Sequence, residues 1–172
     1  MTTGPILVAD IGGTNTRLGL AGPDGIFEGS ALRYSNRDYS SFYSLVGKYL
    51  RHQKIERCEK ACLAVAAPVE NDGITLTNRD WHIDKSGARA ATGASEIRFL
   101  NDFEALGFAI DRLSDDQISH VAGPKTAISP NGSRLVLGAG TGFNAAAMTL
   151  SVGAQPLVHA AECGHMTLPV ET

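Results

Sequence analysis

The stretch that decides the fold is ILVADIGGTNTRLGL, residues 6–20, in which two apolar runs flank a short polar segment. That segment holds Asp10, Gly12, Gly13 and Thr14, more functional groups than a plain hairpin needs. The glycines let backbone N–H groups approach a ligand with no side chain in the way, and such amides beside a threonine hydroxyl suit a phosphate group. Asp10 would repel a bare phosphate but attract Mg²⁺, directly or through water. The pattern predicts a Mg²⁺-nucleotide site, and a hairpin merely eased by its glycines is the alternative.

Composition is that of an ordinary globular protein. The 172 residues are 43% hydrophobic and 19% charged, with a formal net charge of −3. This balance argues against nucleic acid or an anionic membrane as the main partner. No window is apolar for the length of a membrane span, and the first residues lack the basic and apolar regions of a signal peptide. The odd count of three cysteines favours reduced thiols. We expect a cytoplasmic protein.

The N-terminal third predicts three strands in a row and then a helix. The strands are expected at 6–10, 16–21 and 26–34, with a turn at the sequence GPDG. Asp38 is the expected N-cap of the helix. The apolar residues that follow have helical spacing and predict its buried face: Phe42, Leu45, Val46, Tyr49 and Leu50.

The next segments alternate between strand and helix. The apolar runs at 61–69 and 97–100 are typical of strands buried on both faces. Between them lie a short strand at 74–78 and a small helix at 84–93. A second helix is expected to start at Asn101 and Asp102, with Phe103, Leu106, Ile110 and Leu113 on its apolar face. This order predicts an α/β fold with a mixed sheet covered by helices.

A polar segment rich in Gly and Pro at 114–133 suggests a domain boundary. We expect a small N-terminal domain at 1–115 and the start of a second, similar domain at 116–172. The second part again reads as strand, glycine loop (GAGTG, 138–142) and strand. The loop is not a dinucleotide fingerprint, because Phe143 replaces the third glycine. Two such hairpins predict that a nucleotide binds between two domains.

The second domain contributes only about three strands before Thr172 and none of the helices needed to cover them. Such a half-built sheet exposes an apolar face, which favours self-association. We therefore expect either a fragment of a longer protein, inactive alone, or a face that something else covers.

Four polar residues are candidates for binding a hydroxylated substrate. Asn101 and Asp102 follow a buried strand, where ligands of open α/β sheets bind. Glu162 and His165 lie three apart beside a glycine. Together they offer the donors and acceptors that sugar hydroxyls require. Asp102 is either a helix N-cap or a general base that takes a proton from a substrate hydroxyl.

With these motifs assembled, the chain resembles bacterial ATP-dependent glucokinase, of the hexokinase and actin-like ATPase (ribonuclease H-like) superfamily. The resemblance rests on DIGGTNTRLGL, AVAAPV with LTNRDWHID, FLNDFEALGFAI, LGAGTG and ECGHMTLP, in that order. It implies phosphorylation of glucose by ATP in glycolysis, with Asp102 as the base for the 6-hydroxyl. The residues that it implies for glucose binding are Asn101, Asp102, Glu162 and His165. Those that it implies for ATP are Asp10 (with Mg²⁺), Gly12, Gly13 and Thr14 in the first loop and Gly140, Thr141 and Gly142 in the second.

Two features leave alternatives open. The sequence GTGFN is closer to the hexokinase form of the loop than to the glucokinase form, so a hexokinase of broader sugar specificity is one alternative. The family's chain also continues well beyond Thr172. A non-catalytic sugar-sensing or regulatory protein on the same fold is the other alternative, because a fold does not determine a function.

Overall fold

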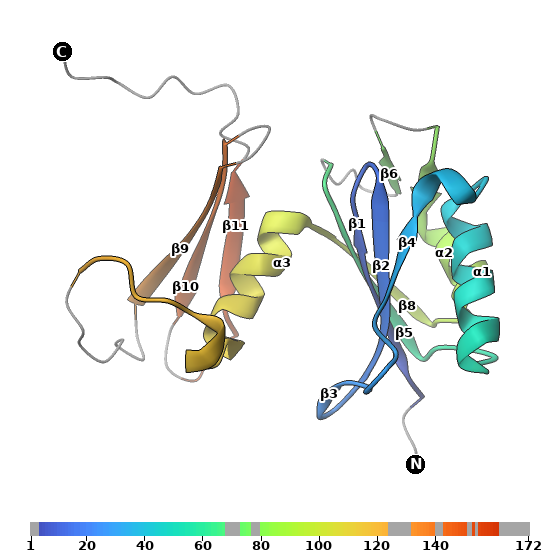
Figure 1. Cartoon of the computed structure of the whole chain (residues 1–172), viewed down its shortest axis with the longest axis horizontal. Coiled ribbons are helices and arrows are strands. Elements are labelled where there is room, and N and C mark those ends of the chain that lie inside the picture. Colours follow the sequence, from blue (N-terminus) through green and yellow to red (C-terminus); the bar gives the residue numbers. More distant parts are fainter. Residues whose placement is uncertain are drawn as a thin grey trace. The chain divides into compact units, whose positions relative to one another are not determined.

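The computed structural model describes residues 4–67, 73–76, 80–123, 132–139, 143–150, 153 and 155–161 (Figure 1). The chain forms two compact units, Met1–Asp102 and Phe103–Thr172. The helix that starts at Asp102 thus belongs almost entirely to the second unit, whereas the sequence analysis placed it in the first domain. The domain limits 1–115 and 116–172 stay a prediction for the whole protein.

The first unit contains a six-stranded mixed sheet in the order β3-β2-β1-β5-β8, with β4 paired to β2. β1 pairs antiparallel with β2, and it pairs parallel with β5, which in turn pairs parallel with β8. This is the mixed sheet that the sequence predicted. The strands are β1 (Ile6–Ile11), β2 (Asn15–Gly22), β3 (Gly25–Ile26), β4 (Leu32–Ser35), β5 (Lys60–Val65) and β8 (Glu96–Asn101).

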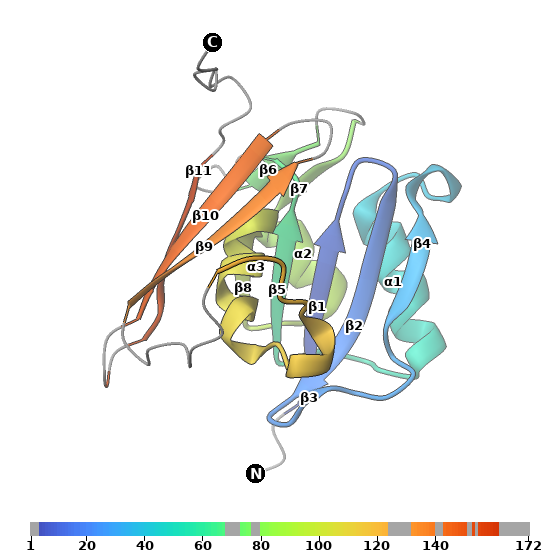
Figure 2. The same cartoon turned by 60° about the vertical axis from the view of Figure 1, so that its left-hand side comes forward.

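Two helices, α1 (Phe42–Gln53) and α2 (Lys85–Thr92), cover one face of this sheet (Figures 1 and 2). The strands alternate, so that Leu7 and Ile11 of β1 and Leu63 of β5 point into the core beneath the helices. All five apolar residues predicted for the face of α1 are buried. A two-stranded ladder of β6 (Gly73–Thr75) and β7 (His82–Asp84) adds Ile74 and Ile83 to the same core.

The predicted N-cap of α1 was wrong. Asp38 belongs instead to a short 3₁₀ turn, η1 (Asn36–Asp38), after which the chain is extended up to the helix. Ser41 caps α1: its side chain accepts the N–H of Ser44, whose side chain accepts the N–H of Ser41 in return. A capping residue has extended backbone and stands directly before the first helical turn, which is the position of Ser41, whereas Asp38 lies in the 3₁₀ turn.

The single strand predicted at 26–34 is two short strands, β3 and β4. Gly29 interrupts it with a left-handed backbone (φ 72°), which a side chain other than glycine's rarely adopts. The next residue, Ser30, is buried, and its hydroxyl accepts the N–H of Leu20 while donating to the carbonyl of Phe27. These bonds hold the connection between β3 and β4 against β2.

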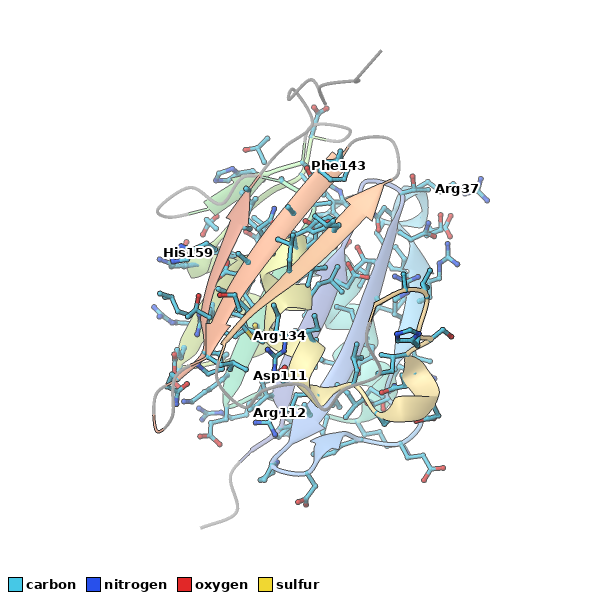
Figure 3. The ribbon with its side chains drawn as sticks, turned by 90° about the vertical axis from the view of Figure 1, so that its left-hand side faces the viewer. Arg37, Asp111, Arg112, Arg134, Phe143 and His159 are labelled. Carbon is cyan, nitrogen blue, oxygen red and sulfur yellow. The ribbon has the colours of Figure 1, made fainter. Side chains whose placement is uncertain are left out.

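The second unit contains an antiparallel sheet of β9 (Gly132–Ala139), β10 (Phe143–Leu150) and β11 (Leu157–Ala161) in the order β11-β10-β9. These are the three strands that the sequence predicted. Helix α3 (Asp102–Ala109) precedes two 3₁₀ turns, η2 (Ile110–Arg112) and η3 (Asp115–Gln117). Asp111 of η2 pairs with Arg134 of β9, as Figure 3 shows.

The apolar face predicted for α3 packs only in part. Leu106 and Leu113 of that face are exposed, at 50% and 45%, whereas the ring of Phe103 lies so close to Gly138 of β9 that a Cβ there would collide with it. Gly107, which is not on the predicted face, stands equally close to Val158 of β11. The helix thus meets this sheet through glycines, which allow a close approach.

The N-terminus of α2 carries a carboxylate that stabilises it. Asp84 is the N-cap: its Oδ1 accepts the hydroxyl of Ser86 and the N–H of Gly87, the latter at 2.7 Å. These hydrogen bonds lower the pKa of Asp84 to about 2, and the bond from the Ser86 hydroxyl has the largest effect. The hydroxyl of Tyr43 on α1 also contacts this carboxylate, at 3.2 Å from Oδ2, and so ties the two helices together.

A carboxylate with a depressed pKa stabilises the fold above its unfolded pKa, and this contribution is lost as pH falls through the folded value. We expect the melting temperature of the unaltered protein to exceed that of Asp84→Asn above about pH 4, and the difference to vanish near pH 2. Asparagine keeps the capping oxygen but cannot titrate. Thermal unfolding of both proteins across this pH range tests the expectation. A difference in melting temperature that does not change with pH would contradict the lowered pKa of Asp84.

Candidate functional site

The parallel strands bring two distant segments to one edge of the sheet. Ile11 of β1 pairs with Val65 of β5, and Val65 pairs with Asn101 of β8. The glycine loop after β1 and Asp102 after β8 therefore leave the sheet at the same edge. Two strand spacings separate them by roughly 10 Å. The predicted phosphate loop and the predicted base are thus brought together by backbone pairing.

The loop itself is a tight connection between β1 and β2. Ile11 pairs with Thr16, and the Gly12 N–H donates to the carbonyl of Asn15 at 3.0 Å. Gly12 and Gly13 are partly buried, whereas Thr14 is exposed. The loop therefore presents its tip at the surface.

Sequence reasoning missed a residue that lies behind this loop. Asn36 of η1 is fully buried. Its side-chain amide donates to the carbonyls of Gly12 and Gly13, and its side-chain oxygen accepts the hydroxyl of Thr16. In the sequence Asn36 stands in the polar run YSNRDYSS, which gives no indication of burial.

Asp10 lies beside the loop on the face of β1 turned away from the helices. Its Oδ2 accepts a hydrogen bond from Arg17 Nη1 at 2.7 Å, across the β1–β2 ladder. Both side chains are more than half exposed. Arg17 therefore pairs with the acid of the neighbouring strand.

Asn101 and Asp102 are both partly buried and stand where the sequence placed them, at the end of β8 and the start of α3. Asp102 is the first helical residue, so Asn101 occupies the position before the helix. A carboxylate in the first turn also interacts favourably with the helix dipole. The remaining predicted site residues, Gly140, Thr141, Gly142, Glu162 and His165, lie outside the described residues.

Comparison with known proteins decides the family. A family profile described as Glucokinase matches residues 7–172. The chain belongs to the glucokinase family. A glucokinase of Marinobacter nauticus is 35% identical over 162 residues, which make up 93% of this chain and 49% of that protein.

Solved structures agree with this family assignment. The crystal structure of a glucokinase from an Antarctic psychrotroph matches with a TM-score of 0.79 at 30% identity, covering 99% of this chain and 54% of that one. A ROK family glucokinase from Streptomyces griseus, solved with glucose and AMPPNP, matches with a TM-score of 0.62 at 18% identity, covering 96% and 51%, and shows the fold alone. The predicted α/β fold of the actin-like ATPase type is confirmed. The chain spans about half the length of the glucokinases that it matches.

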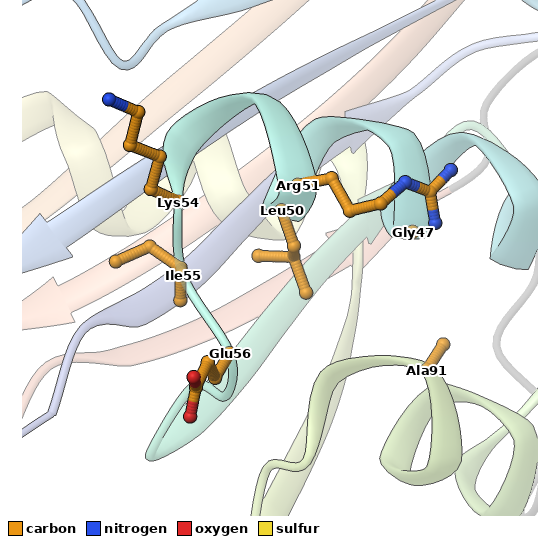
Figure 4. Close-up of a pocket in the computed structure, with 7 residues that line it drawn as sticks. All are labelled: Gly47, Leu50, Arg51, Lys54, Ile55, Glu56 and Ala91. Atoms are coloured by element: carbon orange, nitrogen blue, oxygen red, sulfur yellow. The ribbon is translucent and has the colours of Figure 1, made fainter.

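A pocket of about 550 Å³ lies at the C-terminal end of α1 in the first unit, away from the glycine loop (Figure 4). Its lining includes the charged residues Arg51, Lys54 and Glu56 and the apolar residues Leu50 and Ile55. These residues precede the start of β5, so the pocket lies toward the opposite end of the strands from the glycine loop. It contains none of the predicted site residues.

Within the described ranges, no three acidic, histidine or cysteine side chains converge to hold a metal ion. None of the described helices is long and apolar enough to cross a membrane.

The exposure of the Asp10–Arg17 pair predicts that it adds little to stability. Replacing Arg17 with Gln should lower the free energy of unfolding by at most about 1 kcal/mol, because water and salt screen exposed pairs. Urea denaturation at low and high salt measures this. A loss several times larger would show that Arg17 supports the fold rather than the chemistry at Asp10.

Proposed function

We propose that the protein to which this chain belongs is a glucokinase, transferring the γ-phosphate of ATP to the 6-hydroxyl of glucose. The observation that carries the proposal is the register Ile11–Val65–Asn101, which sets a glycine loop and a carboxylate about 10 Å apart at one edge of the sheet. Phosphoryl transfer requires a phosphate cradle and a base facing the same space. Membership of the glucokinase family supports the substrate pair.

Asp102 is the proposed base. It stands at the carboxyl end of a strand, at the edge where open α/β sheets bind their ligands. Its carboxylate would accept the proton of the 6-hydroxyl as that oxygen attacks the γ-phosphorus, and the bond from the γ-phosphorus to the β–γ bridging oxygen would break with ADP as leaving group. Asn101 would hold a neighbouring hydroxyl, as would Glu162 and His165.

The residues that we assign to phosphate binding are Gly12, Gly13 and Thr14 of the first loop and Gly140, Thr141 and Gly142 of the second. Asp10 would hold Mg²⁺, which would neutralise charge on the phosphates. The residues present fit that ion: Arg17 contacts Oδ2 of Asp10, and none of the described residues is hydrogen-bonded to Oδ1, which would face a cation or its water. Magnesium commonly uses one or two carboxylates together with the phosphates. Membership of the glucokinase family supports ATP as the nucleotide.

The proposed setting is glycolysis in the cytoplasm. Cys58 is buried and forms no disulfide with any described residue, which fits a reducing compartment. Burial raises the pKa of Cys58 to about 11, so this thiol is chemically inert at neutral pH.

Replacing Asp102 with Ala in the full-length protein should lower kcat by a factor of about 10² to 10⁴, because a general base is lost, and should weaken glucose binding moderately. Asp102→Asn, which keeps the shape without the basicity, should lose similar activity. Asp24→Asn, at an exposed turn, is the control. Steady-state kinetics and glucose titration measure these effects. A near-normal kcat for Asp102→Ala would mean that the carboxylate only supports the helix.

The 172-residue chain alone should self-associate and turn over no ATP. Leu135 and Leu137 of β9 and Leu157 of β11 are 57–60% exposed on the second sheet. Apolar faces of this kind recruit partners. Light scattering should show dimers or larger species, and Leu135→Lys with Leu137→Lys should reduce them more than Leu106→Lys on α3. A monomer that phosphorylates glucose would contradict this expectation.

A further inference from the structure

Asn36 makes a set of hydrogen bonds that no other described residue of the first unit makes to the glycine loop. Its Nδ2 donates to Gly12 O at 2.8 Å and to Gly13 O at 3.3 Å, and its Oδ1 accepts from Thr16 Oγ1 at 2.8 Å. Its backbone N–H donates to Thr14 O at 2.9 Å. One fully buried residue thus holds three consecutive carbonyls of the loop.

Holding a carbonyl also sets the direction of the next N–H group. In a planar trans peptide the C=O and N–H bonds point in nearly opposite directions. Because the oxygens of Gly12 and Gly13 point inward to Asn36, the N–H groups of Gly13 and Thr14 point away from it. The N–H of Gly12 is already bonded to Asn15 O, within the connection.

We propose that Asn36 is a positioning residue of the first phosphate loop: it turns the Gly13 and Thr14 amides outward as a ready pair of donors for an anionic oxygen of a polyphosphate. This inference rests on the proposed function, because it assigns these amides to the nucleotide. Asn36 itself touches no ligand and acts only through the loop. Preorganised donors of this kind bind without reorganising when the anion arrives.

A purely structural role makes a different prediction. Asn36 also joins the end of β4 to β2, as Ser30 does nearer the start of β4 through its bonds to Leu20 and Phe27. Both side chains are buried and hydrogen-bonded, so losing either should lower stability. Of these two residues, Asn36 contacts the loop and Ser30 does not, which makes Ser30→Ala a matched control.

The test uses the full-length protein with Asn36→Ala, Thr16→Val and Ser30→Ala. Thr16→Val removes the hydroxyl that anchors Asn36 Oδ1 while leaving the loop carbonyls in place. Two readouts are needed. The first is the KM for ATP beside the KM for glucose, and the second is the amide resonances of Gly13 and Thr14 during titration with magnesium tripolyphosphate.

Asn36→Ala should raise the KM for ATP about tenfold, as expected for the loss of one or two supported hydrogen bonds, and should leave the KM for glucose unchanged. The Gly13 and Thr14 resonances should shift without ligand and respond less to tripolyphosphate. Thr16→Val should act in the same direction but less strongly. Ser30→Ala should lower the melting temperature and leave both KM values unchanged.

Folded Asn36→Ala with an unchanged KM for ATP and unchanged amide resonances would overturn the proposal. If that variant does not fold, an unchanged KM in Thr16→Val overturns it equally. If Ser30→Ala raises the KM for ATP as much as Asn36→Ala does, the role is structural and the proposal is wrong. If the unaltered protein binds neither ATP nor tripolyphosphate, the proposed function fails and this inference fails with it.

Discussion

The parallel pairing of β1, β5 and β8 is the constraint on which the rest of the site depends. A parallel ladder cannot slip by one residue without turning every side chain to the opposite face of the sheet. Such a slip would expose Leu7, Ile11 and Leu63, which are completely buried under α1 and α2. The apolar core therefore fixes the register, and the register fixes which residues emerge together at the carboxyl edge. The packing of the core therefore determines which residues lie together at the candidate site.

The same edge carries two carboxylates, Asp10 and Asp102, although the proposed ligand is itself a polyanion. Arg17 compensates the charge of Asp10 from the neighbouring strand, at 2.7 Å. The dipole of α3 favours a negative charge at Asp102, in its first turn. These arrangements allow acidic groups to stand where a phosphate would otherwise be repelled. The remaining imbalance is a physical reason to expect a nucleotide that arrives with its divalent cation.

How far the sequence predicts this structure depends on where the deciding contacts lie. The face of α1 follows from helical spacing alone, and Asp10 and Asp102 were found because each stands next to an apolar strand. The packing of α3 was predictable only in part: Phe103 of the predicted face contacts Gly138, but Gly107, which meets Val158, carries no hydrophobic periodicity. Asn36 was missed because its partners Gly12 and Gly13 are 24 and 23 residues away, and only the tertiary fold buries it.

The register of a strand and the orientation of a loop are fixed by different interactions. A ladder of hydrogen bonds fixes the position and the peptide planes of every paired residue, but Gly13 and Thr14 stand outside the ladder between β1 and β2. Glycine peptides can rotate through many orientations, and each orientation aims its N–H elsewhere. A loop that must present donors in one direction therefore needs a support of its own. In our proposal the polar turn η1 supplies it, which gives a reason for a fully buried asparagine beneath two consecutive glycines.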